Sequence, residues 1–210
     1  MTKPLTCTDP IISFKNFESI KQTEENQTCL QAKGEIVLRD FNLVATTYRR
    51  IERNACSELR YLLEQAGDSA AVVEKSGVAG LITAKTVLDP IEAVKRLREI
   101  LLERPYEFRY LLRVIPIEKI VRTDLREIEG VTKELGARIS ENEAFRVTVE
   151  KRFTTLHTNE IIEIAASSIK RKADLKKPDK ILLIQVIGKL TGISLIKPND
   201  ILSVLKEKML

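Results

Sequence analysis

The feature that most constrains the fold of this chain is an almost unbroken apolar run at residues 181–187, ILLIQVI. A strand with one solvent-facing side alternates in polarity, whereas an unbroken apolar strand indicates burial on both faces, as in the middle of a sheet. Gly188 permits a short turn, and residues 193–196 form a second apolar run soon after it. The sequence therefore predicts a central strand with an antiparallel neighbour.

The residues before this run predict a strand and a helix. Phe145, Val147 and Val149 alternate with polar residues, which is typical of a strand with one buried face. From about residue 159, apolar residues recur at helical spacing, with Thr158 placed to cap the first turn and the basic triplet 170–172 closing the last. A strand, helix and strand joined this closely should form a right-handed parallel crossover.

A Lys-Arg pair and an Asp-Leu-x-x-Pro-Asp segment occur at defined places in this series. The positions are Lys151, Arg152, Asp174, Leu175, Pro178 and Asp179. In that order, together with the capped helix and the two apolar runs, they resemble the THUMP family of tRNA-binding domains. The resemblance is closest to lone THUMP proteins that assist cytidine acetylation in tRNA, and with the preceding domain it covers roughly residues 41–210.

Residues 41–116 contain a second series of periodic segments. The patterns predict strands at 43–47, 70–74, 78–84 and 108–114, with one helix after the first strand and another beginning at Asp89-Pro90. Ser76-Gly77 indicates a hairpin between the two middle strands. The order βαββαβ is that of a ferredoxin-like domain, in which two helices cover one face of an antiparallel sheet. We therefore expect the other face to be less covered.

These patterns divide the chain into a poorly defined N-terminal segment (1–40), a ferredoxin-like domain (41–116) and a THUMP α/β domain (117–210). The predicted fold class is a mixture of α+β and α/β. Residues 116–140 are expected to form a helical linker that belongs to the second domain, because Asp124 and Glu127 resemble a capping box. Residues 34–38 are expected to lead into a strand.

The overall charge permits binding to a polyanion without requiring it. Lys and Arg number 35 against 30 Asp and Glu, a net charge of +5. Cys7, Cys29 and Cys56 are too few and too scattered for a disulfide framework or a zinc site, which is typical of reduced thiols. Since no apolar run approaches the length of a membrane span, we expect a soluble, cytoplasmic protein without a membrane partner.

Few residues could support catalysis. The single histidine, His157, has no Cys or Glu at metal-ligand spacing, so a structural or capping role is expected. THUMP domains are commonly fused to methyltransferases, sulfur-transfer enzymes and deaminases, and the signature motifs of those enzymes are missing from this sequence. We therefore predict no catalytic residue, no metal and no cofactor. By resemblance, the chemistry would lie on another chain.

Cations near the predicted strand and helix ends are candidate RNA contacts. The full set is Arg146, Lys151, Arg152, Lys170, Arg171, Lys172, Lys176 and Lys177. Lys151 and Arg152 precede a helix start, where phosphates are favoured. The triplet 170–172 would also complement a helix dipole, and Arg146 would also suit a solvated strand face. Since Phe108, Tyr110 and Phe145 are interpreted as core residues, recognition would rest on phosphates and shape.

The resemblance implies tRNA as the partner, contacted at its acceptor end or elbow, and an RNA acetyltransferase as a second partner. Under this hypothesis the protein is an adaptor that presents tRNA to a modifying enzyme. Three alternatives stay open: a small-molecule-binding or oligomerisation module, a general RNA-binding protein, and an enzyme acting through unassigned residues.

Overall fold

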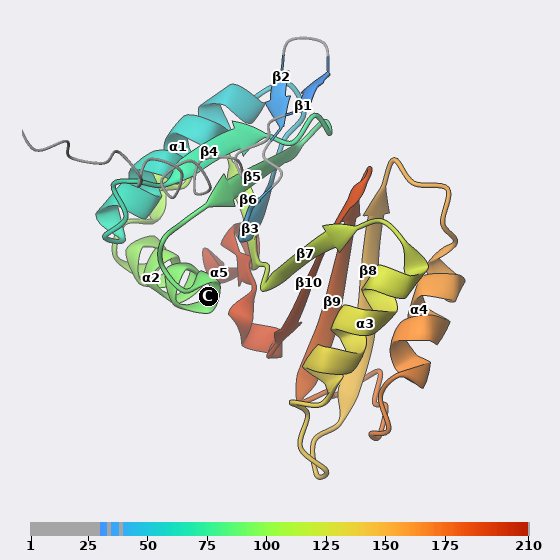
Figure 1. The fold of residues 1–210 in the computed structure, drawn as a ribbon. Helices are drawn as coiled ribbons and strands as arrows, with labels where there is room; N and C mark the ends of the chain where they lie inside the picture. The colour runs from blue at the N-terminus through green and yellow to red at the C-terminus, as the bar shows by residue number, and fades with distance from the viewer. Residues whose placement is uncertain (1–29, 33–34, 38–39, 210) are drawn as a thin grey trace, which may run out of the picture.

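The computed structural model describes residues 30–32, 35–37 and 40–209, and the mixed α/β class predicted from the sequence is confirmed (Figure 1). The strands β1 (Leu30–Ala32) and β2 (Glu35–Val37) pair as an antiparallel hairpin. Strand β2 lies within residues 34–38, which were expected to lead into a strand. The expectations for residues 1–29 lie outside the described residues. No helix among the described residues is both long and apolar enough to cross a membrane.

The first unit has the predicted order βαββαβ. Its elements are β3 (Leu43–Thr47), α1 (Glu52–Gln65), β4 (Val72–Lys75), β5 (Leu81–Lys85), α2 (Pro90–Glu103) and β6 (Leu111–Pro116). The sheet is antiparallel in the order β6-β3-β5-β4. As predicted, Asp89 caps α2, because its side chain accepts the N–H groups of Ile91 and Glu92 at 3.0 Å each.

The last strand of this unit begins three residues later than the sequence predicts, at Leu111 rather than Phe108. The short 3-10 helix Pro105–Glu107 precedes it. The Glu58 carboxylate on α1 accepts the backbone N–H groups of Arg109, Tyr110 and Leu111 at about 3 Å, so these groups are satisfied without strand pairing. Phe108 is nevertheless buried, as is Phe145, which confirms the interpretation of both as core residues.

The second unit contains the predicted strand, helix, strand and strand. Its elements are β7 (Lys119–Arg122), α3 (Leu125–Gly136), β8 (Phe145–Arg152), α4 (Thr158–Ser167), β9 (Lys180–Ile187) and β10 (Leu190–Ile196). The sheet order is β7-β10-β9-β8, with β8 and β9 parallel and the other pairs antiparallel. The central strand β9 is buried along residues 181–187, as its apolar run predicts.

Three details of this unit differ from the prediction. Part of the expected helical linker is the strand β7, which has only four residues and pairs at a sheet edge, too short to produce a period. The N-cap of α4 is His157 rather than Thr158. The helix ends at Ser167, so Lys170, Arg171 and Lys172 lie beyond its last turn. Asp124 does cap α3, accepting the N–H of Arg126 at 2.8 Å.

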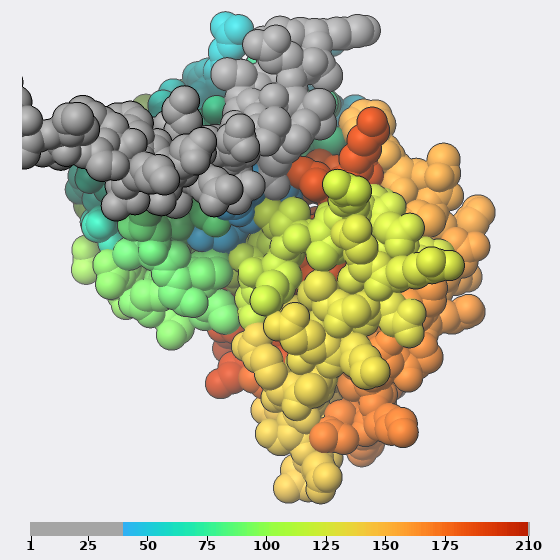
Figure 2. Space-filling view, viewed as in Figure 1, coloured from blue at the N-terminus to red at the C-terminus, as the bar shows by residue number. Residues whose placement is uncertain are grey.

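The two sheets pack against each other. Helices α3 and α4 cover the face of the second sheet that is nearer in Figure 1, and the first unit lies to the left of the second unit in Figures 1 and 2. The residues between the sheets include Val44, Leu81 and Ile115 from the first unit and Leu183 and Ile187 from the second, all buried. The face of the first sheet opposite its two helices was expected to be less covered. It is buried instead against the second sheet of the same chain.

The end of the chain returns to the first unit. After the 3-10 helix Pro198–Asp200, β11 (Leu202–Ser203) pairs with β6, and α5 (Val204–Glu207) follows. Leu202 and Val204 lie in the core of the first unit. Arg98 on α2 pairs with Glu207 at 2.8 Å. These contacts, which no local pattern predicts, tie residues 198–207 to the unit formed by residues 43–116.

Candidate nucleic-acid interface

Three strand ends and two helix starts meet at one edge of the second sheet. The register places Arg122, Leu190, Ile187 and Arg152 in one row, so the last residues of β7, β9 and β8 lie side by side. Residues 122–124, 153–156 and 188–190 line a cleft there. This carboxyl edge of the sheet, at the top of the second unit in Figure 1, is where α/β sheets commonly place ligands.

Phe153 is the most unusual residue of the cleft. Its side chain is 75% exposed, and its backbone has a φ of 54°, in the left-handed region that a non-glycine residue rarely adopts. The surrounding loop is held by its own hydrogen bonds, because Lys151 Nζ donates to the Leu156 carbonyl at 2.7 Å and Gly188 N–H donates to the Arg152 carbonyl at 2.9 Å. The fold therefore maintains an exposed aromatic ring in a strained backbone.

Cations border this ring. Arg122 and Lys189 are exposed, and neither forms an ion pair within the described part of the chain. The segments that carry these two cations are hydrogen-bonded to each other. The backbone N–H of Thr123, next to Arg122, donates to the Lys189 carbonyl at 2.9 Å, and the Thr123 and Thr191 hydroxyls lie 3.0 Å apart. Of the two predicted cations at this edge, Lys151 is exposed and Arg152 is half-buried.

Arg152 lies at the same edge but points between the two sheets. Its Nη2 is 3.7 Å from Glu150 Oε2, and its Nη1 is buried and has no hydrogen-bond partner among the residues that the structure describes. Glu150 in turn pairs with Arg113 of β6 at 2.6 Å. Burial opposes ionisation of Glu150, but the charges of Arg113 and Arg152 and the hydrogen bonds from Arg113 and Gln185 together outweigh it. The pKa of this carboxyl is therefore held below its ordinary value. Arg152 thus belongs to a chain of charges that links the units.

The remaining candidates lie at the opposite end of the sheet. Arg146 precedes Arg152 by six residues along β8, which corresponds to roughly 20 Å at about 3.3 Å per residue. Two of these cations hold the local structure: Arg146 donates to the Leu175 carbonyl at 3.1 Å and Arg171 to the Ile139 carbonyl at 2.9 Å. The structure therefore does not bring all predicted RNA contacts together.

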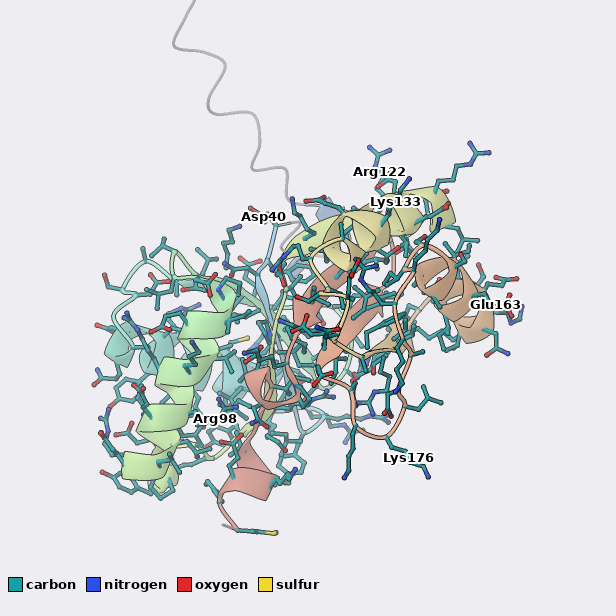
Figure 3. All side chains as sticks on the ribbon, turned by 90° about the horizontal axis from the view of Figure 1, so that it is seen from below. Asp40, Arg98, Arg122, Lys133, Glu163 and Lys176 are labelled. Carbon is teal, nitrogen blue, oxygen red and sulfur yellow. The ribbon has the colours of Figure 1, made fainter. Side chains whose placement is uncertain are left out.

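Four lysines at that opposite end are exposed: Lys170, Lys172, Lys176 and Lys177. Figure 3 shows Lys176 and Arg122 projecting from the ribbon in different directions. Asp174 folds the loop, since its carboxylate accepts the N–H groups of Lys177 and Lys176, and these hydrogen bonds lower its pKa. Its part in the Asp-Leu-x-x-Pro-Asp motif is therefore structural.

Sequence reasoning missed Phe153, Arg122 and Lys189. Phe153 belongs to no periodic pattern, although a lone aromatic residue in a polar stretch directly after Lys151-Arg152 was a usable signal. Within residues 40–209, no group of three His, Cys, Asp or Glu side chains is arranged to hold a metal ion. His157 caps α4, and its N–H lies 3.3 Å from Glu160 Oε2. The site offers binding groups: an aromatic face and solvent-facing cations.

No protein-family model matches the sequence, and no curated protein matches it. The solved structure of PH1313 from Pyrococcus horikoshii Ot3 is similar, with a TM-score of 0.57 and 18% identity over 75% of this chain and 55% of that one. TrmN from Thermus thermophilus gives 0.49 and 15% identity, covering 74% and 45%. A 4-thiouridine synthetase–RNA complex with bound ATP gives 0.45 and 15%, covering 75% and 42%. The chain spans about half the length of these proteins, and the similarity to PH1313 shows a shared fold.

Proposed function

We propose that this protein binds tRNA at the carboxyl edge of its second sheet and acts as a non-catalytic adaptor. In this proposal it presents tRNA to a modifying enzyme, and the resemblance to lone THUMP proteins points to cytidine N4-acetylation. The first unit is the ferredoxin-like domain and the second the THUMP domain. The order of elements on which the resemblance rests is present as β8, α4, β9 and β10, which supports the assignment.

The observation that carries the proposal is the exposed ring of Phe153 among exposed cations. Single-stranded RNA is commonly bound by stacking a base on an aromatic side chain while cations neutralise the backbone. Lys151, Lys189 and Arg122 supply those charges, and Phe153 supplies the stacking surface. Residues in strained backbone conformations tend to occur at functional sites. The exposed ring of Phe153 contributes nothing to packing, and a role in binding would account for its strained conformation.

One alternative loses its physical basis in this fold. An oligomerisation or ligand-binding role for the ferredoxin-like unit would use the open face of its sheet. That face carries Val44 and Ile115, both 0% exposed, and the second sheet covers it. A general RNA-binding role without a partner enzyme predicts the same result as the adaptor role in the first experiment below. The two roles predict different results only in the second experiment.

The first experiment measures affinity for a fluorescently labelled, unmodified tRNA transcript. Phe153→Gly keeps the left-handed backbone accessible while removing the ring, and the lost stacking should weaken binding by about tenfold or more. Adding Lys189→Ala should weaken it further and reduce the salt dependence by about one phosphate contact. The control is Lys176→Ala with Lys177→Ala at the opposite end of the sheet, which should change affinity less than threefold. If Phe153→Gly binds the tRNA with the same affinity as wild type, the proposal that tRNA binds at this cleft is wrong.

The second experiment tests the adaptor role. Unmodified tRNA is incubated with this protein, with a candidate RNA acetyltransferase, and with both, in the presence of an acetyl donor, and nucleosides are measured by mass spectrometry. Acetylcytidine is expected only when both proteins are present, and Phe153→Gly should reduce its yield. Acetylcytidine from this protein alone would overturn the adaptor proposal, and full activity of the enzyme alone would leave only RNA binding.

A further inference from the structure

A group of exposed arginines lies between the end of β3 and the first turn of α1. Arg49, Arg50 and Arg53 are exposed, and no ion pair of any of them occurs among the described residues. Tyr48 beside them is 52% exposed. Guanidinium groups that have no acidic partner in the described part of the chain favour phosphate, because the planar fork of arginine binds phosphate oxygens in pairs.

The backbone at Arg50 is strained in the same way as at Phe153. Arg50 has a φ of 73°, and these two are the only non-glycine residues in the described ranges with positive φ. Such a conformation costs on the order of 1–3 kcal/mol for a residue with a side chain. The Glu52 carboxylate maintains it by accepting the N–H groups of Gly80 at 2.6 Å and Arg50 at 3.2 Å. The fold thus holds an exposed arginine in an unfavourable backbone conformation.

This arginine group lies on the same side of the molecule as the cleft. A Cβ atom on Gly80 would lie 3.7 Å from Arg49 Cγ, so Arg49 borders the tip of the β4–β5 hairpin. At the same tip, Val78 packs against the apolar cluster that contains Ile187, the last residue of β9. In Figure 1 the β4–β5 hairpin extends to the right, toward the upper end of β9 and β10. The tip of the β4–β5 hairpin therefore contacts Arg49 on one side and packs near the end of β9, next to Lys189, on the other.

We infer that Tyr48, Arg49, Arg50 and Arg53 form a second RNA-contact surface, which binds phosphates of the same RNA that enters the cleft at Phe153. This inference rests on the proposed function and extends the binding surface to the first unit. The arginines bind the backbone, and the exposed Tyr48 ring offers a face for a base. The chain of charges from Arg113 through Glu150 to Arg152 holds the units in one arrangement, so both surfaces stay available to one ligand.

The test uses the full-length protein and the same labelled tRNA transcript at several salt concentrations. Arg49→Ala with Arg53→Ala should lower affinity by at least about tenfold, since two phosphate contacts are lost and a single charged hydrogen bond already contributes about that much. The slope of log affinity against log salt should fall by about 1.4–1.8, since two phosphate contacts are lost. Lys95→Ala on α2, an exposed cation paired with Glu92 at 3.6 Å, serves as the control and should leave both quantities unchanged.

Arg50→Gly separates an RNA contact from a structural role. Glycine adopts positive φ without strain, so the melting temperature should stay equal or rise while RNA affinity falls. Wild-type affinity and salt slope in the Arg49→Ala, Arg53→Ala protein would overturn this inference and leave the cleft proposal intact. A wild-type protein without affinity for the transcript would overturn both.

Discussion

The two faces of the central strand β9 have different surroundings. Toward α3 and α4, Leu182, Ile184 and Val186 lie in a core built from apolar side chains. Toward the first unit, Leu183 and Ile187 also pack against apolar residues, but the register places Gln185 on the same face. Glu150 and Ser194 add polar groups from the neighbouring strands.

The two faces of this sheet therefore have different structural roles. The helix-covered face builds the second unit, and many apolar combinations of similar volume would serve that purpose. The face between the units must also fix their relative orientation, and the Arg113–Glu150 pair at 2.6 Å forms only when β6 and β8 are correctly placed. Since the proposed RNA surface spans both units, its geometry depends on the contacts that fix their relative orientation.

The largest expected effect comes from truncating neighbouring core residues on the two faces. Leu182 and Leu183 are both 0% exposed, one in each cluster. Leu182→Ala and Leu183→Ala should each reduce the free energy of unfolding by about 2–5 kcal/mol, because each leaves a cavity. Urea denaturation followed by circular dichroism measures both values.

RNA affinity distinguishes the two variants under conditions where both are folded. Leu183→Ala loosens the interface between the units and should weaken tRNA binding, whereas Leu182→Ala should leave affinity close to that of wild type. A stability loss below about 1 kcal/mol for Leu183→Ala would mean that the sheets do not form a packed interface.

An intermediate effect is expected from the charges between the units. Arg113→Met leaves the Glu150 carboxylate, whose side chain is 24% exposed, without its closest partner. The cost should be about 1–3 kcal/mol at neutral pH, less than for a fully buried pair. The surface pair Lys119–Glu134 at 3.2 Å supplies the control, and Lys119→Met should cost less than about 1 kcal/mol.

The same pair predicts an acid-sensitive contribution to stability. Because the pKa of Glu150 is lowered in the folded protein, its ionised form stabilises the fold. This contribution is fully present above the ordinary carboxyl pKa of 4.5 and is lost as the pH falls through the lowered value. Glu150→Gln should reduce the loss of stability measured between about pH 5 and pH 3. An unchanged acid profile would contradict the role of this carboxylate.

Local periodicity was sufficient for the elements that build each unit. The strand pattern at 43–47, the Asp89-Pro90 helix start and the apolar run at 181–187 predicted β3, α2 and β9, since one face or both faces of each are buried. The short strands β7 and β11 were not predicted, because each depends on pairing with a strand far away in sequence.

The candidate site was predicted only in part, for a related reason. Alternation along β8 puts Arg146, Glu150 and Arg152 on the face opposite Phe145, and a sequence does not say what covers that face. The cover is the first unit, so Arg152 faces an interface where a solvated position was expected. Phe153 and Arg50 depend on backbone conformation, which neither residue type favours.

The smallest expected effect concerns a single hydroxyl on β10. Ser194 is 0% exposed, and its Oγ is buried with no hydrogen-bond partner within the described ranges of the chain. A buried hydroxyl without a partner costs roughly 1–3 kcal/mol, so Ser194→Ala should leave the free energy of unfolding unchanged or raise it by about 1 kcal/mol. Thr191 on the same strand is equally buried, but its hydroxyl lies 3.0 Å from that of Thr123. Thr191→Val should therefore lower stability by about 1 kcal/mol, because Thr123 loses its partner. If Ser194→Ala instead costs as much as Thr191→Val, water satisfies the Ser194 hydroxyl, and the face between the units is hydrated where the helix-covered face is dry.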